Sequence, residues 1–116
     1  MSKSLLIHNP KCSKSRGAKE ILEAEGVDFI TINYIHDGLK EKLLKHLPAL
    51  TGLSFKEMVR TKEDLYKELK LDEKNLSDKE WIAVLVKHPI LLERPIFIHN
   101  DKAVIARPAE LVKTIL

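Results

Sequence analysis

The chain has 116 residues, of which 44% are hydrophobic and 32% are charged. This length predicts a single domain over residues 1–116 and excludes a multidomain enzyme. The formal net charge is +3, from 20 Lys and Arg against 17 Asp and Glu. Such a mild basic excess favours small anionic partners over nucleic acid, which needs a concentrated basic patch. No apolar run approaches the ~20 residues of a membrane helix or forms a signal peptide, so we expect a cytoplasmic protein without a membrane partner.

The first third of the chain alternates between strand and helix patterns. A short apolar run over residues 4–8 stops at Asn9-Pro10 and predicts a buried strand. From Ser13, apolar residues recur at helical spacing until Gly26, which suits the end of a helix. Residues 27–34 are rich in β-branched and aromatic side chains, which predicts a second strand. Together these segments form a βαβ unit, whose two strands we expect to be parallel.

The middle of the chain, residues 37–90, carries successive helical patterns. The first follows the leucines between Leu39 and Leu50, and the second opens at Thr61. The third opens at Ser77, which with Glu80 has the spacing of a capping box. This region is therefore predicted to be helical.

The last quarter of the chain has the pattern of a hairpin followed by a helix. Two apolar runs, 96–99 and 103–106, flank the turn-forming Asn100-Asp101 and predict a β-hairpin. Pro108 suits the first position of a closing helix. The resulting order, βα-β-helices-ββα, predicts an α/β fold with a helical insertion.

Cys12 is the only cysteine, which excludes an intrachain disulfide, a CxxC redox pair and a multi-cysteine zinc site. The histidines lack metal-ligand spacing, so we expect no metal. Cys12 directly precedes the first predicted helix, whose unpaired N–H groups and positive dipole end stabilise a thiolate. An ordinary cysteine with a pKa near ~8.5 is only about 3% thiolate at pH 7, and such a position lowers that pKa. Cys12 is therefore a candidate nucleophile; the alternative is an inert, buried thiol.

The arginines are few and placed at breaks in the pattern. Only four occur, against sixteen lysines: Arg16, Arg60, Arg94 and Arg107. The guanidinium group suits bidentate binding of a tetrahedral oxyanion, whereas this chain uses Lys on its solvated faces. Any one of these arginines could simply form an ion pair on the surface. Taken together, the four indicate an anion-binding site.

Three further residues are candidates for supporting roles. His8 offers a positive charge or a hydrogen bond to the thiolate, or is simply the polar end of the first strand. Ser15 offers its hydroxyl to the sulfur or to a bound anion, or caps the helix. Pro95, after Arg94, is a candidate for a cis-proline in the wall of the site.

These residues belong to motifs that occur in order along almost the whole chain. The motifs are His8-Asn9-Pro10-Lys11-Cys12-Ser13-Lys14-Ser15-Arg16, then Arg60, Tyr66-Lys67-Glu68-Leu69, His88-Pro89-Ile90-Leu91-Leu92-Glu93-Arg94-Pro95-Ile96 and Ala106-Arg107-Pro108. In this combination the chain resembles the glutaredoxin-coupled arsenate reductase family, within the ArsC/Spx superfamily. The resemblance implies a thioredoxin-like fold with a mixed sheet and a helical insertion at about residues 37–90.

The same resemblance implies a reaction and a role for each candidate. By position, Cys12 corresponds to the nucleophile, and the oxyanion is bound by Arg60, Arg94 and Arg107. The supporting residues are His8, Ser15 and the cis-proline Pro95. The implied reaction reduces arsenate to arsenite through a thioarsenate on Cys12, with glutathione as co-substrate, glutaredoxin as partner and no tightly bound cofactor. A lone cysteine fits this scheme, because it cannot close a disulfide within the chain and must borrow an external thiol.

Two other functions stay open at this point. A pocket with a thiol and arginines also suits the carboxylates of glutathione, as in a glutathione-dependent thiol oxidoreductase of unknown substrate. An Spx-like regulator that binds RNA polymerase is the second alternative. Such regulators usually carry a CxxC switch where this chain has Ser15, so the serine favours an enzyme.

Overall fold

A four-stranded mixed sheet forms the centre of the computed structural model, which describes residues 4–116; the first three residues of the expected 1–116 domain lie outside the described part. The strands are β1 (Ser4–His8), β2 (Phe29–Asn33), β3 (Ile96–His99) and β4 (Lys102–Ile105), in the spatial order β2-β1-β3-β4. β1 pairs with β2 in parallel, as predicted, and β3 is antiparallel to both β1 and β4. The βαβ unit and the C-terminal hairpin predicted from the sequence are thus confirmed.

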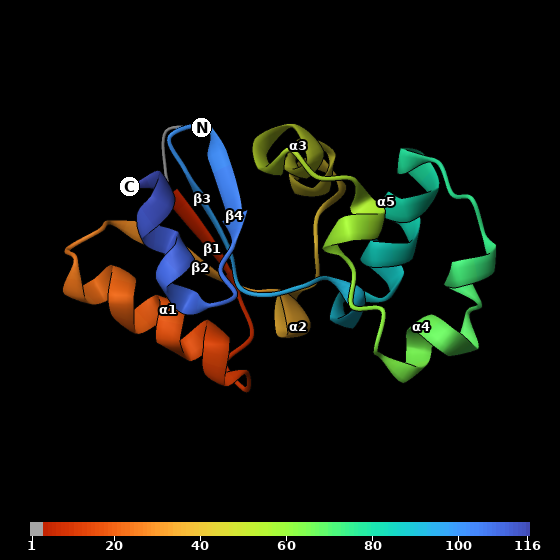
Figure 1. The fold of residues 1–116 in the computed structure, drawn as a ribbon, viewed down its shortest axis with the longest axis horizontal. Coiled ribbons are helices and arrows are strands. Elements are labelled where there is room, and N and C mark those ends of the chain that lie inside the picture. The colour runs from red at the N-terminus through yellow and green to blue at the C-terminus, as the bar shows by residue number, and fades with distance from the viewer. Residues whose placement is uncertain (1–3) are drawn as a thin grey trace.

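Each face of the sheet carries its own apolar cluster, because successive side chains of a strand point to opposite faces. On one face, Leu6 and Phe97 pack with α1 (Ser13–Ala24) and with the C-terminal 3-10 helix η4 (Ala109–Ile115). Figure 1 shows α1 and this C-terminal segment lying together against the sheet. On the other face, Ile7 and Ile96 belong to the larger cluster formed with the helical part of the chain.

Between β2 and β3 the chain forms helices joined by loops. They are α2 (Tyr34–Asp37), α3 (Glu41–Thr51), α4 (Asp64–Glu68) and α5 (Asp78–Lys87), with the short 3-10 helices η1 (Phe55–Met58), η2 (Leu71–Glu73) and η3 (Pro89–Leu91). The capping box at Ser77 and Glu80 is confirmed, and a second one, which the sequence analysis missed, starts η1 at Ser54 and Glu57. Within residues 4–116, no helix combines the length and apolar character that a membrane crossing requires.

Several boundaries differ from the prediction: β2 starts at Phe29 instead of residue 27, and α4 starts at Asp64 instead of Thr61. Two further differences have local reasons. β2 ends at Asn33, whose side chain accepts a hydrogen bond from the N–H of His36 at 3.3 Å, so Tyr34 begins α2 instead of ending the strand. The closing helix forms, but as a 3-10 helix, and Pro108 precedes it in an extended conformation (φ −72°, ψ 164°) instead of occupying its first turn. The hairpin turn is as predicted: Asn100 and Asp101 take positive φ values of 50° and 61°, which their short polar side chains tolerate.

Candidate active site

The predicted site residues gather at one edge of the sheet. β1 and β2 are parallel, so both end there, and β1 leads directly into the loop that carries Cys12. β3 is antiparallel to β1, so it starts at this edge, just after Arg94 and Pro95. β4 returns to the same edge and ends just before Arg107. The sheet topology therefore brings the thiol and two of the arginines together from distant parts of the sequence.

Cys12 is the N-cap residue of α1 and follows a loop held by local hydrogen bonds. The N–H of Cys12 donates to the carbonyl of Asn9 at 3.0 Å, and the side-chain oxygen of Asn9 accepts from the N–H of Lys11 at 3.0 Å. Nη1 of Arg16 donates to the carbonyl of Pro10 at 2.9 Å. Arg16 thus braces the loop around Cys12, and the loop holds the sulfur at the start of the helix.

The Cys12 thiol is half-buried and its pKa is lowered to about 7. Burial raises this pKa, but the N–H of Ser15, the guanidinium of Arg94 and the N–H of Lys14 together lower it by more. Close to half of the thiol is therefore thiolate at pH 7, compared with a few per cent of an ordinary cysteine. Cys12 has the chemistry of an activated nucleophile that solvent can reach.

Alkylation of Cys12 by iodoacetamide is expected to reach half of its maximal rate near pH 7, because only the thiolate reacts. The rate should rise with pH through this value, as the thiol loses its proton. Mass spectrometry over a pH series measures it directly, since the chain has one thiol. The same chain in denaturant is the control and should titrate near ~8.5. Coinciding midpoints, or a folded thiol that resists the reagent throughout, would contradict the proposed activation.

Arg60 reaches the site through a backbone pairing that no sequence pattern indicated. An isolated antiparallel bridge joins Val59 to Leu92, and the N–H of Arg60 donates to the carbonyl of Leu91 at 2.7 Å. Because Arg94 lies two residues beyond Leu92, this pairing fixes Arg60 next to the segment that leads into β3. The helical insertion thereby contributes one arginine to the edge of the sheet.

Arg107 is placed by an extension of the β3–β4 hairpin. The N–H of Ala106 donates to the carbonyl of Pro95 at 2.9 Å, and Nη1 of Arg107 donates to the carbonyl of Arg94 at 3.0 Å. The peptide bond between Arg94 and Pro95 is cis, as expected, and so is the one before Pro108, which was not predicted. The side chain of Arg107 is thus tied to the backbone of Arg94.

Arg94 is the charged side chain that lowers the pKa of the Cys12 thiol. Its guanidinium lowers the pKa of both Cys12 and Tyr34. Its Nε and Nη1 atoms are buried, yet they have no hydrogen-bond partner among residues 4–116. Buried cationic donors without partners are costly unless a ligand takes them. The arrangement is suited to an anion bound directly beside the sulfur.

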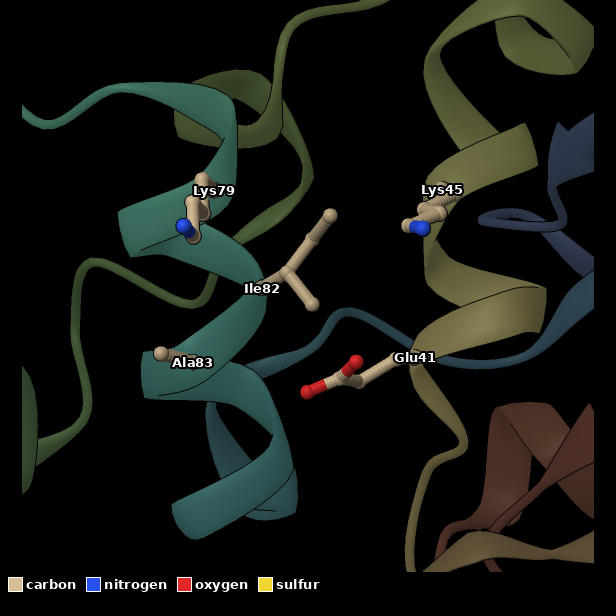
Figure 2. A pocket seen from close by; sticks show the side chains of 5 residues that line it. All are labelled: Glu41, Lys45, Lys79, Ile82 and Ala83. Carbon is tan, nitrogen blue, oxygen red and sulfur yellow. The ribbon is translucent and has the colours of Figure 1, made fainter.

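Arg60 and Arg107 line a cavity of about 240 Å³, together with Val59, Thr61, Lys62 and Glu93. Arg60 lies 3.6 Å from a carboxylate oxygen of Glu93 and 3.8 Å from one of Glu63, so its charge is only loosely compensated. A larger cavity of about 440 Å³ lies between α3 and α5 (Figure 2). Neither cavity is lined by Cys12, but only the smaller one is lined by arginines, so it is the better candidate for an anion.

The sequence model of the ArsC family matches residues 7–115. The chain belongs to the ArsC family. An arsenate reductase of Neisseria meningitidis serogroup A is 41% identical over 112 residues, which cover 96% of each chain. The uncharacterized protein YfgD of Escherichia coli K12 is 42% identical over 118 residues, covering 100% of this chain and 99% of its own. Among solved structures, an arsenate reductase from Vibrio cholerae is 42% identical with a TM-score of 0.92 over 98% of both chains.

These similarities confirm the thioredoxin-like α/β fold of the ArsC family that the sequence motifs implied. They also agree with the mixed sheet and with the helical segment between β2 and β3.

The structure gives the surroundings of the two supporting polar residues, His8 at the end of β1 and Ser15 in the first turn of α1. The pKa of His8 is lowered, first by burial and then by Lys19 and Arg16, so the ring is neutral at pH 7 and brings no positive charge to the thiolate. The hydroxyl of Ser15 accepts a hydrogen bond from the N–H of Asn9 at 3.3 Å, and the N–H of Ser15, instead of its hydroxyl, lowers the pKa of Cys12. Ser15 therefore braces the loop and activates the thiol through its backbone.

Tyr34 is the residue of the site that sequence reasoning missed. It is fully buried, and its pKa is raised to about 12 by burial, although Arg94 and Arg60 act in the opposite direction. Its position in the sequence could have indicated that it lies at the site. Tyr34 directly follows the second strand of the βαβ unit, and this strand ends at the same edge of the sheet as the strand before Cys12.

Proposed function

We propose that this protein reduces arsenate to arsenite. The observation that carries the proposal is the Cys12 thiol, with a pKa of about 7, beside the unpaired buried donors of Arg94. Arsenate is a tetrahedral anion, and a thiolate can approach it only if cationic donors offset the repulsion between the two charges. Relatives named arsenate reductase, at 41% identity over nearly the full length, support the same conclusion.

In this proposal each of the three arginines binds a different part of the oxyanion. Arg94 holds arsenate oxygens next to the sulfur, using the donors that no residue among 4–116 occupies. Arg60 and Arg107 approach from the adjoining cavity, where their guanidinium groups are only partly engaged. The N–H groups of Lys14 and Ser15 stabilise the thiolate before attack.

The chemistry then proceeds in two stages at Cys12. The thiolate forms a bond to arsenic, and an arsenate hydroxyl takes up a proton and leaves as water, which gives a thioarsenate in which arsenic is still pentavalent. The thiolate of glutathione next attacks the Cys12 sulfur. A disulfide forms between the two sulfurs, the sulfur–arsenic bond breaks, and its electron pair reduces arsenic to the trivalent state of arsenite.

Regeneration needs an external thiol, because the chain has no second cysteine. A thiolate of glutaredoxin attacks the glutathione sulfur of the mixed disulfide and releases the Cys12 thiolate. Glutathione is thus a co-substrate and glutaredoxin a partner, with no tightly bound cofactor. A reducing cytoplasm is the compartment that would supply both thiols.

The test is a coupled assay that follows NADPH oxidation with arsenate, glutathione, glutaredoxin and glutathione reductase. We expect saturable oxidation that requires this protein, arsenate and both thiol components. Phosphate in place of arsenate should give none, since thiols do not reduce it. Oxidation no faster than in the mixture without this protein would contradict the proposal. RNA polymerase pull-down and a disulfide substrate such as hydroxyethyl disulfide would then test the two alternatives.

A further inference from the structure

The cavity lined by Arg60 and Arg107 also contains two charged side chains to which the proposed chemistry gives no role, those of Lys62 and Glu93. A carboxylate repels an oxyanion, so Glu93 does not suit a cavity that takes only a simple anion. A ligand with a positive and a negative group would engage both side chains. The volume, about 240 Å³, is below the ~300–1,000 Å³ of pockets that enclose a whole drug-sized ligand, so it suits one end of such a molecule.

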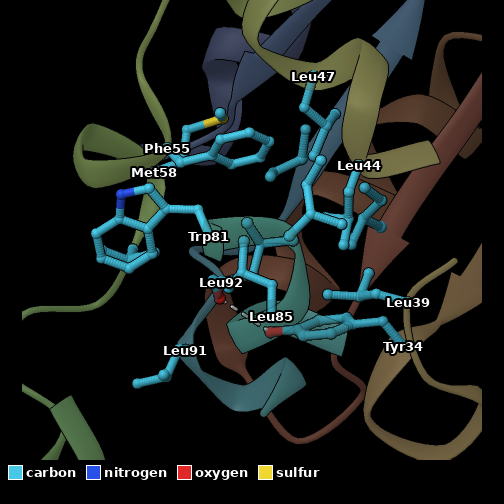
Figure 3. Close-up of a cluster of buried hydrophobic side chains, with 14 of the residues drawn as sticks. Tyr34, Leu39, Leu44, Leu47, Phe55, Met58, Trp81, Leu85, Leu91 and Leu92 are labelled. Carbon is cyan, nitrogen blue, oxygen red and sulfur yellow. Dashed lines mark hydrogen bonds between the residues drawn. The ribbon is translucent and has the colours of Figure 1, made fainter. Parts of the chain in front are cut away.

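The bridge between Val59 and Leu92 fixes the backbone of Glu93. The N–H of Glu93 donates to the carbonyl of Met58 at 2.8 Å. The carbonyl of Leu92 accepts a hydrogen bond from the hydroxyl of Tyr34 at 3.2 Å, drawn as a dashed line in Figure 3. The same figure shows the side chains of Met58 and Leu92 among the larger buried cluster. The segment from which Glu93 projects is therefore anchored on the core.

Arg60 and Glu93 project from this bridge on the side away from the core. Each follows a buried residue in an extended conformation, Val59 or Leu92, and successive side chains of an extended segment alternate between its faces. Nη1 of Arg60 lies 3.6 Å from a carboxylate oxygen of Glu93, and the two side chains are 25% and 28% exposed. This distance exceeds that of an ordinary hydrogen bond, so both charges keep bonding capacity for a ligand that enters from solvent.

The cavity lies near Cys12 because of the sheet topology. One row of paired residues across β1, β3 and β4 consists of Ile7, Ile96 and Ile105. Beyond this row, β1 continues into the loop that carries Cys12, and β4 continues to Arg107, which lines the cavity. Neighbouring strands lie ~4.8 Å apart, so about 10 Å separates the two backbone segments. An extended tripeptide also spans about 10 Å, so a thiol tripeptide with one end in the cavity is long enough to bring its sulfur towards Cys12.

We propose that this cavity binds the γ-glutamyl end of glutathione, with Glu93 accepting hydrogen bonds from its ammonium group and Lys62 binding its carboxylate. The glutamyl α-carbon carries these two opposite charges side by side, and the cavity offers a carboxylate and cations to match them. The inference rests on the function proposed above, in which glutathione is the co-substrate. It makes Glu93 and Lys62 specificity residues for the thiol, distinct from the three arginines that serve the oxyanion.

The experiment measures disulfide exchange at Cys12 of the intact protein, without arsenate. The Cys12 thiolate attacks one sulfur of glutathione disulfide, the bond between the two glutathione sulfurs breaks, and one glutathione leaves as its thiolate. Mass spectrometry follows the mixed disulfide, since the chain has one thiol. Two other disulfides are compared. That of N-acetylglutathione lacks the ammonium groups, and hydroxyethyl disulfide lacks all charges, so its rate reports the reactivity of the thiol itself.

Glu93→Gln is expected to slow glutathione disulfide by about threefold or more relative to hydroxyethyl disulfide, because the ammonium group loses its charged partner. The disulfide of N-acetylglutathione should react at least as fast as with the native protein, since the variant removes a negative charge that repels its carboxylates. A change in charge alone would speed both glutathione compounds, because both are net anions. Opposite signs therefore identify a contact between Glu93 and the ammonium group.

Lys62→Ala is expected to slow both glutathione compounds relative to hydroxyethyl disulfide, because both keep the glutamyl carboxylate. Glu68→Gln and Lys67→Ala are the matched controls. Both residues are exposed on α4 and neither lines the cavity. Both variants should give the relative rates of the native protein.

Outcomes against the proposal are equally defined. A native or increased relative rate of glutathione disulfide in Glu93→Gln would overturn it. Equal losses for the acetylated and unacetylated compounds in that variant, or native relative rates in Lys62→Ala, would also overturn it. In the coupled assay, Glu93→Gln should raise KM for glutathione by more than KM for arsenate. If the native protein turned over no arsenate, the proposed function would fail while the exchange rates would still decide whether the cavity recognises glutathione.

Discussion

Cys12→Ser is expected to abolish arsenate-dependent NADPH oxidation, with a loss of about a thousandfold or more in kcat, the scale seen when a catalytic nucleophile is removed. The serine hydroxyl is not ionised at neutral pH, so the N–H groups and the guanidinium that lower the pKa of the thiol have no anion to stabilise. An oxygen at this position also cannot form the disulfide through which electrons reach arsenic. The coupled assay measures the loss.

Ser13→Ala is the matched control for this variant, since Ser13 is the exposed next residue on the same helix. It should retain native turnover. Arsenate-dependent activity in Cys12→Ser above the level of the mixture without protein would mean that Cys12 is not the nucleophile. Matching unfolding curves for the two variants would show that the loss reflects chemistry and not folding.

The local parts of the site follow from short stretches of sequence. Cys12 was predicted at the start of a helix because Asn9-Pro10 ends one element and the helical spacing begins directly after it. The hairpin and the capping box at Ser77 were predictable for the same reason, since their determinants lie within four residues of each other.

The remaining features depend on contacts between distant segments. The bridge of Val59 to Leu92 brings Arg60 to Arg94, and neither segment carries a regular pattern that indicates the pairing. The neutral state of His8 follows from burial and from cations on the neighbouring helix, which a list of residue types does not reveal. Tyr34 looked like one more aromatic residue of a strand, because its hydrogen bond to the carbonyl of Leu92 joins two segments far apart in the sequence.

Arg94→Ala is expected to have the second large effect on activity. It should weaken both the Cys12 nucleophile and the binding of arsenate. The pKa of Cys12 should rise, since burial of the sulfur still opposes ionisation and only the N–H groups of Ser15 and Lys14 remain to offset it. Arsenate also loses donors directly beside the sulfur. A hydrogen bond to a charged group contributes about 1.5–3 kcal/mol, so kcat/KM for arsenate should fall by roughly ten- to a hundredfold. The coupled assay and the alkylation series measure the two effects.

Arg94→Lys separates the charge of Arg94 from its geometry. A lysine keeps a cation near the sulfur, so the midpoint of alkylation should stay closer to the native value of about 7 than in Arg94→Ala. It lacks the planar fork that binds two oxygens at once, so kcat/KM for arsenate should still be reduced. Lys79→Ala, which removes a cation from the cavity between α3 and α5, should change neither quantity. If Arg94→Ala kept native kcat/KM and a native midpoint, the anion would have to bind elsewhere, and the cavity lined by Arg60 and Arg107 would be the site to test next.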